Sequence, residues 1–418
     1  AGEYHKYDLL DYFHVDPCFG GDEALHHLVR VLHARGIRIL IDGVFNHCGW
    51  HFFAFEDVVE KGEASSYRDW FYGLKFPVVC PDDPEDYPEY ECFAYERMMP
   101  KLDTANPAVR EYFCEVGRYW VKNFHIDGWR LDVVADLGNS REYNHQFWKK
   151  FRKAVKEANP EAVILAENYG DSYDWLQGDE WDTIMNYDAF MEPVTWFLTG
   201  MQKHSDEFRQ DMLGNAGNFF GAMHHNMSRM GGQAVAISMN ELSNHDHSRF
   251  LTRTNHRVGR TASVGAEAAN EGINKAVFME AVIIQMTWPG APTIYYGDEA
   301  GVCGWTDPDN RRTYPWGSED RELIAFHKAA IAMHKSQEVL KTGSYKPLVG
   351  EYNLIAYGRF NTKDAVVVIV NNSEEMEQIF VTFDGGFGEE QLWYTVNGGW
   401  LDIGLRKTSA VVLKRVKW

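Results

Sequence analysis

The first 343 residues alternate between short apolar runs that end in polar residues and longer segments with helical periodicity. Residues 37–42, Ile-Arg-Ile-Leu-Ile-Asp, are typical of a buried strand. Just before them, apolar positions within 25–32 repeat at helical spacing, and Gly36 ends that helix. Further strands are predicted at 126–134, 162–167, 183–187, 234–240 and 291–296, and further helices from Pro107, at 276–288 and at 322–334. This alternation predicts βα units around a parallel sheet.

The pattern supplies six strands, whereas a closed (β/α)8 TIM barrel has eight. Residues 4–12 are typical of a loop that leaves a strand, so one or two barrel strands are expected before Ala1. Residues 48–104 are too long for a simple loop and predict an inserted subdomain. From residue 344, short alternating strands predict a C-terminal antiparallel β-sandwich. The predicted fold class is therefore α/β, with a barrel in 1–47 and 105–343, the subdomain in 48–104 and the sandwich in 344–418.

Composition narrows the classes of function. With 41 Lys and Arg against 61 Asp and Glu, the net charge is −20, which argues against a nucleic-acid partner. No apolar run is long enough for a transmembrane helix, so no membrane is expected. The 6 cysteines lack metal-binding spacing and are expected to be free thiols, which favours a reducing compartment and a cytoplasmic location. The 14 Trp and 21 Tyr residues fit either a large core or stacking against sugar rings.

Carboxylates follow several predicted strands, at the end where parallel barrels carry their chemistry. Arg130 and Asp132 lie two residues apart, so their side chains share one side of a strand. The cation is expected to lower the pKa of Asp132 and keep it ionised, as a nucleophile requires, unless the pair is only a structural salt bridge at the rim. Glu167 ends an apolar run, so a raised pKa and a general-acid role are expected, with a buried, paired glutamate as the alternative.

Two further strand ends carry His47 and the turn Asn244-His245-Asp246. Asp246 can bridge sugar hydroxyls as a bidentate acceptor, and the spacing of the two histidines is not a zinc pattern. Each is weak evidence alone, because loops are rich in such residues and a histidine after a strand is often a core residue. In order along the chain, however, these strand ends indicate a site in which two carboxylates cleave a glycosidic bond.

Five ordered motifs resemble those of the α-amylase superfamily, glycoside hydrolase family 13. The four conserved regions of that family are matched by Asp42–His47, Gly128–Asp132, Ala166–Asn168 and Ser243–Asp246. Met99–Asp103 resembles the Met-Pro-Lys-Leu-Asn signature of the neopullulanase, cyclomaltodextrinase and maltogenic amylase subgroup, with Asp in place of Asn. Residues 290–299 resemble the last barrel strand of the family. The resemblance covers nearly the whole chain.

The resemblance implies a retaining α-glucan hydrolase that cleaves α-1,4-glucosidic bonds in cyclodextrins, pullulan, maltooligosaccharides or starch by double displacement. Asp132 would be the nucleophile, Glu167 the acid/base and Asp246 the transition-state stabiliser. Retention predicts that the carboxyls of Asp132 and Glu167 lie about 5–5.5 Å apart. The implied substrate-binding residues are Tyr7, His47, Arg130, His245, Asp307 and Arg311.

The chain departs from the family pattern at two places. Ala135 and Asp136 stand where Lys-His or Asn-Glu are common, and Asn168-Tyr169 stands where Ile-Trp or Val-Trp is usual. The family's contacts to the acceptor sugar and its calcium site are therefore in doubt. No cofactor is expected to be required and no metal ligands are assigned, while calcium stays open without a clear motif. Two other functions stay open: a glucan transglycosylase or branching-type enzyme, and a non-catalytic glucan-binding protein on the same fold. The expected partner is an α-glucan, and a homodimer stays open.

Overall fold

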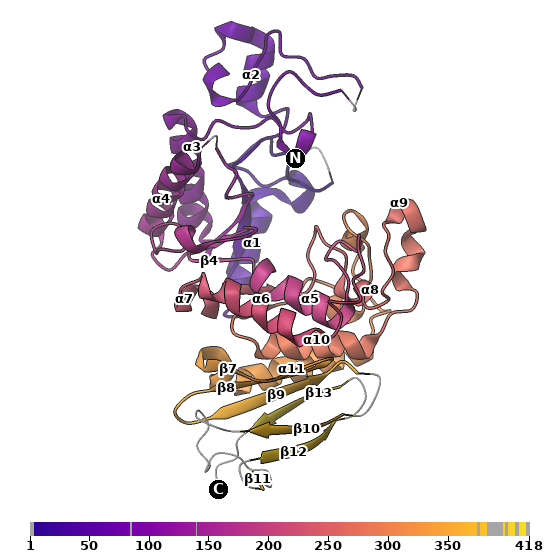
Figure 1. The fold of residues 1–418 in the computed structure, drawn as a ribbon. Helices are drawn as coiled ribbons and strands as arrows, with labels where there is room; N and C mark the ends of the chain where they lie inside the picture. Colours follow the sequence, from indigo (N-terminus) through magenta and orange to yellow (C-terminus); the bar gives the residue numbers. More distant parts are fainter. Residues whose placement is uncertain are drawn as a thin grey trace. The chain divides into compact units, whose positions relative to one another are not determined.

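The computed structural model describes residues 4–83, 86–138, 140–373, 377–382, 396–397, 400–405 and 409–414. The chain folds into two compact units, Ala1–Ile184 and Met185–Trp418, called here the first and the second unit (Figure 1). Across the described part of the chain, every helix is too short or too polar to cross a membrane.

The first unit contains a four-stranded parallel sheet whose strands are β1 (Leu40–Val44), β2 (Gly128–Asp132), β3 (Val163–Ala166) and β4 (Thr183–Ile184), in that order. The register pairs Asp42 with Arg130 and Arg130 with Leu165. Because the strands are parallel, the residues that follow β1, β2 and β3 emerge at the same edge of the sheet. The strands are shorter than predicted. β2 ends at Asp132 because Val133 has a φ of 47°, which no extended strand can accommodate.

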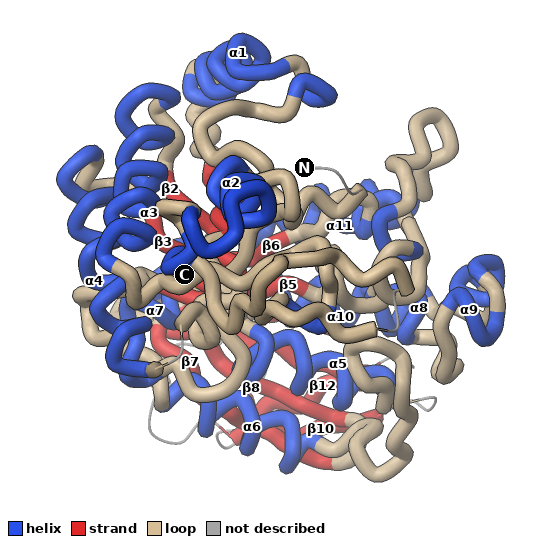
Figure 2. The backbone as a smooth tube through the Cα atoms, turned by 90° about the horizontal axis from the view of Figure 1, so that it is seen from above, coloured by secondary structure: helices blue, strands red, loops and turns tan. Residues whose placement is uncertain are grey.

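Three long helices belong to this unit: α1 (Gly21–His33), α3 (Pro107–Tyr119) and α4 (Arg141–Ala158). Pro107 occupies the first turn of α3 behind the cap Asn106, whose side chain accepts from Ala108 N at 2.9 Å. Figure 2 shows α3 and α4 alongside β2 and β3. The two helices pack closely because Gly117 leaves room for the ring of Phe151, which a Cβ at that position would meet at 2.6 Å.

The segment between β1 and α3 carries α2 (Phe53–Lys61), which is labelled in Figure 1. Its other helical turns are η2 (Gly62–Ala64), η3 (Arg68–Trp70) and η4 (Phe93–Tyr95), and η1 (Pro17–Phe19), η5 (Trp120–Phe124) and η6 (Tyr173–Trp175) lie elsewhere in the unit. This segment returns to the end of β1, where Leu102 N donates to Asn46 O at 3.0 Å and Cys48 N donates to Pro100 O at 3.1 Å. These bonds fix the chain on both sides of His47.

The second unit carries a parallel pair, β5 (Met239–Glu241) and β6 (Ala291–Thr293). Its helices are η7 (Tyr187–Met191), α5 (Glu192–Thr199), α6 (Ala216–Ser228), α7 (Gly232–Ala236), α8 (Phe250–Arg253), α9 (Thr261–Val264), η8 (Ala266–Asn270), α10 (Lys275–Thr287), η9 (Asp298–Ala300), η10 (Asp309–Arg311), α11 (Arg321–Ser336) and α12 (Glu338–Thr342). The prediction of a strand at 234–240 is wrong for its first part, because residues 234–236 belong to α7. A short apolar run fits a helix or a strand equally well.

Two antiparallel sheets follow α12. The first contains β7 (Ser344–Glu351), β8 (Leu354–Phe360), β9 (Ala365–Asn371) and β13 (Ser409–Lys414), in the order β13-β9-β8-β7. The second contains β10 (Glu377–Thr382), β11 (Val396–Asn397) and β12 (Trp400–Leu405), in the order β10-β12-β11. Every residue of β9 is buried, because α10 and α12 contact this sheet from within the second unit. The apolar core of this unit runs from α5, α6 and α10 into β8 and β9.

Candidate active site

Arg130 is the centre of the polar cluster at the strand ends of the first unit. Its Nη1 lies 3.0 Å from Asp42 Oδ1 and 2.8 Å from Asp132 Oδ1. Its Nη2 lies 3.0 Å from Glu167 Oε2. The register explains the arrangement, since Asp42 and Arg130 are paired across β1 and β2, and Glu167 directly follows β3. One guanidinium therefore contacts three carboxyl groups, on three neighbouring strands.

Burial determines the protonation of Asp132. Burial raises the pKa of Asp132 well above its ordinary value; Arg130 opposes the shift, and the nearby carboxyls of Glu167 and Asp42 add to it. Arg130 lowers the pKa of Asp132 as predicted, but burial outweighs this effect, so the expectation that Asp132 stays ionised is wrong in its net direction. The spacing correctly predicts the Arg130–Asp132 contact, but one shared cation does not offset burial and two like charges. The cluster thus holds a proton more readily than an isolated carboxyl does.

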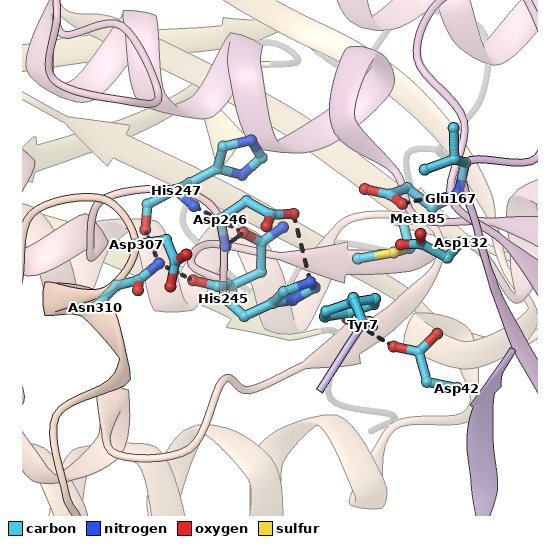
Figure 3. A network of polar contacts seen from close by, with 12 residues as sticks. Tyr7, Asp42, Asp132, Glu167, Met185, His245, Asp246, His247, Asp307 and Asn310 are labelled. Carbon is cyan, nitrogen blue, oxygen red and sulfur yellow. Dashed lines mark hydrogen bonds and ion pairs between the residues drawn. The ribbon is translucent and has the colours of Figure 1, made fainter. Parts of the chain in front are cut away.

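Tyr7 extends the cluster on the β1 side. Its hydroxyl donates to Asp42 Oδ2 at 2.8 Å (Figure 3). Burial raises the pKa of the phenol, so Tyr7 keeps its proton at neutral pH. Asp42 is thus held by two donors, Tyr7 and Arg130, and supports both side chains in place.

The backbone after β2 positions Glu167. Glu167 N donates to Leu131 O at 2.8 Å, and Val133 N donates to Glu167 Oε2 at 3.3 Å. Val133 has a φ of 47°, which a β-branched residue rarely adopts and which costs about 1–3 kcal/mol. The left-handed turn follows Asp132 directly, so it both ends the strand and supplies a hydrogen bond to the second carboxyl.

His47 is fully buried at the end of β1. Its ring stacks on Phe93, with centroids 4.5 Å apart and planes 11° from parallel. Burial lowers the pKa of His47 to about 3, so its imidazole is neutral at ordinary pH. Its carbonyl accepts from the hydroxyl of Tyr12 at 3.0 Å. A neutral, rigid imidazole suits hydrogen bonding to a sugar hydroxyl better than binding an anion.

In the second unit, Asn244 shapes the turn that carries His245 and Asp246. Its Oδ1 accepts from the backbone N–H groups of Asp246 and His247, each at 3.0 Å. Its Nδ2 donates to Tyr187 Oη at 3.1 Å and to Glu241 Oε1 at 2.9 Å. His245 Nε2 lies 3.5 Å from Asp246 Oδ2 (Figure 3), and the side chain of Asp246 is 38% exposed. Asp246 is thus fixed by its backbone and open to a ligand.

Asn310 and its neighbours connect this turn to the segment 307–311. Asn310 Nδ2 donates to Asn244 O at 3.0 Å and to His247 O at 2.9 Å. Asp307 and Arg311 form an ion pair in which Nε and Oδ1 are 2.5 Å apart. Both line a hollow of about 560 Å³ in the second unit.

The structure brings together most of the predicted residues within each unit. Tyr7, Arg130, Asp132 and Glu167 are linked through Asp42 and Arg130, His245 contacts Asp246, and Asp307 contacts Arg311. Their proposed roles, and the predicted separation of the two carboxyls, stay predictions. Sequence reasoning did not assign Asp42, Val133, Phe93, Asn244 or Asn310. The sequence carried a signal for Asp42, because this residue is the first of the motif Asp42–His47.

The described residues do not fit the calcium site that the family often has. The carbonyl oxygen of Asp136, at the position where a family backbone carbonyl helps to hold calcium, accepts from the ammonium of Lys101 at 3.0 Å. A cationic side chain therefore already contacts this oxygen. Among the residues that the structure describes, no group of three His, Cys, Asp or Glu side chains is arranged to hold a metal ion.

Comparison with known proteins identifies the family. Residues 2–341 match the alpha-amylase family model, described as alpha amylase, catalytic domain. The chain belongs to the alpha-amylase family. A cyclomaltodextrinase from a Bacillus species is 38% identical over 374 residues, which are 88% of this chain and 60% of that protein. Neopullulanase 2 from Thermoactinomyces vulgaris is 38% identical over 385 residues, 90% of this chain and 59% of that protein.

A solved structure of a debranching enzyme from Nostoc punctiforme matches 99% of this chain and 83% of that chain, at 30% identity and a TM-score of 0.86. Together with the parallel strands and the C-terminal antiparallel sheets, this match confirms the predicted α/β barrel fold class. The chain spans about 60% of the length of these two curated relatives. The predicted domain boundaries and the cytoplasmic location stay predictions.

Proposed function

We propose that this chain contributes the catalytic carboxylates of a retaining α-glucan hydrolase that cleaves α-1,4-glucosidic bonds. The observation that carries the proposal is the contact of one guanidinium with Asp132 and Glu167, at the ends of neighbouring parallel strands. Two buried carboxyls of this kind are what glycosidic cleavage by double displacement requires. The relatives named cyclomaltodextrinase and neopullulanase support the substrate class.

In the first step, Glu167 transfers its proton to the glycosidic oxygen while the Asp132 carboxylate bonds to the anomeric carbon. The carbon–oxygen bond breaks, and the acceptor sugar leaves with the proton. Glu167, now an anion, removes a proton from water, and the water oxygen displaces Asp132 from the anomeric carbon. The productive form therefore has the proton of the cluster on Glu167 and the charge on Asp132, next to Arg130 Nη1.

The remaining residues have proposed roles that follow the family resemblance. Asp246 stabilises the oxocarbenium-like transition state. His47, whose imidazole is neutral, and His245 bind hydroxyls of the cleaved glucose. Tyr7 stacks under that glucose, while Asp307 and Arg311 bind the next one outward. Asp307 and Arg311 fit this role because their ion pair presents both an acceptor and donors at the rim of a hollow.

Transglycosylation is a second candidate, because a sugar hydroxyl can replace water in the second step without any change in the carboxylates. The observation that favours it is a hollow of about 360 Å³ that begins at Asn168 and Tyr169, directly after Glu167. This space can seat an acceptor sugar. The non-catalytic alternative gains no support from the structure, since Asp132 and Glu167 are both present and both contact Arg130.

The test is product analysis on β-cyclodextrin, pullulan and soluble starch, with the Asp132→Asn variant and an Asp69→Asn control on an exposed side chain. We expect short linear products in the α configuration, first seen by proton NMR, from the wild type and the control but not from Asp132→Asn. New products longer than the substrate would identify transglycosylation. Products that first appear in the β configuration would contradict the retaining mechanism. Folded protein without activity on any α-glucan would contradict the proposed function.

A further inference from the structure

The first unit has a second hollow, of about 550 Å³, between α4 and the segment 174–180. On α4, Arg141, His145 and Lys149 line it, and they share one helix face because they are four residues apart. From the other side, Asp174 and Asp179 complete the rim. The hollow lies outside the cluster around Arg130, and nothing in the proposed mechanism uses it.

Two ion pairs close the rim of this hollow, which we call the α4 hollow. Arg141 Nη2 lies 2.6 Å from Asp174 Oδ2, and Lys149 Nζ lies 2.9 Å from Asp179 Oδ2. All four side chains are more than half exposed, so the pairs contribute little to stability. They present cationic donors and carboxylate acceptors next to each other, with no net charge. This is a rim for a neutral, polyhydroxylated ligand rather than for an anion.

One lining residue of the α4 hollow, His145, is held in place by a stack of buried rings. The ring of His145 stacks on Trp175 with centroids 3.9 Å apart, and Trp175 stacks on Trp181 with centroids 4.8 Å apart. Trp175 and Trp181 are buried, and Trp181 also packs edge-on against Trp148 of α4. Stacked rings have few rotamers to lose, so a ligand that binds over them orders little of the protein.

The lining of the α4 hollow also carries hydrogen-bonding capacity that the protein does not use. Glu180 is 1% exposed, and its Oε1 lies 2.6 Å from His145 Nδ1. Glu180 lines the hollow, and its Oε2 has no hydrogen-bond partner among the described residues. Burial raises the pKa of Glu180 to about 8 and lowers that of His145, so both are neutral near pH 7. Buried polar groups normally have partners, so Glu180 Oε2 indicates a place for a ligand or an ordered water.

Arg141 connects the α4 hollow to the vicinity of the carboxyls. Arg141 also lines the hollow of about 360 Å³ that begins at Asn168 and Tyr169. The two hollows therefore adjoin at this side chain. Because the general acid protonates the leaving oxygen, the space directly beyond Glu167 lies on the side of the leaving chain. A chain that continues outward across Arg141 reaches the α4 hollow.

We propose that the α4 hollow is an outer binding site for glucosyl residues of a long or branched α-glucan chain on the acceptor side. The inference rests on the proposed function. Rim carboxylates and cations bind sugar hydroxyls, and the unpartnered Oε2 of Glu180 binds a hydroxyl or a bridging water beneath them. The site selects for chain length, since a short acceptor ends before it crosses Arg141.

The test compares two double variants. In Lys149→Ala/Asp179→Ala, one rim pair is removed together, so neither charge is left alone. In the control, Lys153→Ala/Glu157→Ala, an exposed pair of the same helix with Nζ and Oε1 3.1 Å apart is removed. Michaelis parameters are measured on amylose and on an aryl α-maltoside. Binding of maltoheptaose is measured by calorimetry in an Asp132→Asn background, where no hydrolysis disturbs the titration.

We expect the rim variant to raise KM for amylose by about five-fold, the equivalent of one or two hydrogen bonds, with kcat unchanged. The parameters for the aryl maltoside and all values of the control should stay the same. In calorimetry, maltoheptaose should bind the rim variant more weakly by a similar factor. Equal KM ratios in both double variants, or an equal loss on both substrates, would overturn the inference while leaving the hydrolase intact. Wild-type protein without any α-glucan activity would instead overturn the proposed function.

Discussion

Arg130 contacts Asp42, Asp132 and Glu167 at once, so the charge of one guanidinium is divided among three carboxyls. In this environment Asp132 has a raised pKa. The nucleophile is therefore ionised only when another carboxyl of the cluster holds the proton. This is useful for the proposed chemistry, because the acid must hold a proton while the nucleophile does not. The same crowding is unfavourable for folding, which gives the first prediction.

Replacing Asp132 with Asn should abolish hydrolysis, by roughly 10³-fold or more, without loss of stability at neutral pH. The folded protein keeps a proton in the carboxyl cluster around Asp132 that the unfolded chain loses above about pH 4, so wild-type stability falls as the pH rises from that value. Asn has no such proton. The free energy of unfolding is measured in urea. The value of the variant should therefore rise relative to that of the wild type as the pH increases from about 5 to about 8.

A difference in the free energy of unfolding between variant and wild type that does not change with pH would contradict the raised pKa of Asp132. A large loss of stability at both pH values would indicate that Asp132 mainly holds Arg130 in place.

Replacing Glu167 with Gln should separate the two proposed steps. With α-maltosyl fluoride, whose leaving group needs no proton, the variant should release a burst of about one fluoride per protein molecule and then stall. The stall follows because water is not activated without the carboxylate. On maltooligosaccharides, the activity should fall by roughly 10³-fold. A stopped-flow fluoride measurement without a burst, but with steady turnover near the wild-type rate, would remove Glu167 from the acid/base role.

The residue pattern predicted individual contacts of this cluster better than the net effect of these contacts on the pKa of Asp132. Two-residue spacing on a strand predicted that Arg130 and Asp132 would meet, and they do, at 2.8 Å. It could not predict that Asp42 and Glu167 would share the same guanidinium, because that depends on the register of β1, β2 and β3. Nor could it predict the left-handed Val133, since valine carries no sequence signal for a positive φ.

Helix α10 shows how well the pattern of hydrophobic residues predicts the bounds of a helix. The predicted helix, 276–288, differs from Lys275–Thr287 by one residue at each end, and its cap Asn274 accepts from Ala276 N at 3.0 Å. The pattern does not explain Glu280, which is 1% exposed on this helix. Neither of its carboxyl oxygens has a partner among the described residues, and burial raises its pKa well above the ordinary value.

Replacing Glu280 with Leu should therefore stabilise the protein by about 1–3 kcal/mol, because a buried polar group without a partner is removed and helix propensity is kept. Met279→Leu on the same helix serves as the control and should change stability by less than about 1 kcal/mol. Thermal unfolding followed by circular dichroism gives both values. If Glu280→Leu unfolds at a lower temperature than the wild type, the carboxyl has a role in the core that its surroundings do not reveal.

Strands were less predictable than helices. The run 234–240 was expected to be a strand, yet α7 takes residues 232–236 and β5 begins only at Met239. The apolar segment is too short for periodicity to distinguish the two, and the backbone decides through the bridge from Met185 to Met239 and the ladder between β5 and β6. Such pairing is set by residues far away in the sequence, which no local pattern contains.

The whole chain carries a net charge of −20, so mutual repulsion opposes the compact state. Many carboxylates are paired at the surface, for example in Arg260–Asp206 and Lys75–Glu89, but an excess of acidic side chains remains. Raising NaCl from about 10 mM to about 150 mM should raise Tm by about 2 °C or more, because salt screens the repulsion. Choline chloride should raise Tm by a similar amount if screening is the cause. A Tm that falls with either salt would show that attractive ion pairs outweigh the repulsion.

The proposed residues are divided between the two compact units, with Asp132 and Glu167 in the first and Asp246, Asp307 and Arg311 in the second. The order of the motifs along the chain was enough to predict the family and the fold class, because both are properties of the whole sequence. It was not enough for the boundaries of the compact units, which depend on long-range contacts such as those of the core shared by α10, β8 and β9.

The central claim is that Asp132 forms a covalent bond with the sugar, and trapping that intermediate tests it most directly. The wild-type protein is incubated with 5-fluoro-α-glucosyl fluoride, which forms glycosyl-enzymes that break down slowly, then digested at low pH and analysed by mass spectrometry. We predict that the mass of one fluoroglucosyl group appears on the peptide that contains Asp132, and that Asp132→Asn shows none. A label on another carboxylate, or an active protein that never becomes labelled, would contradict the account.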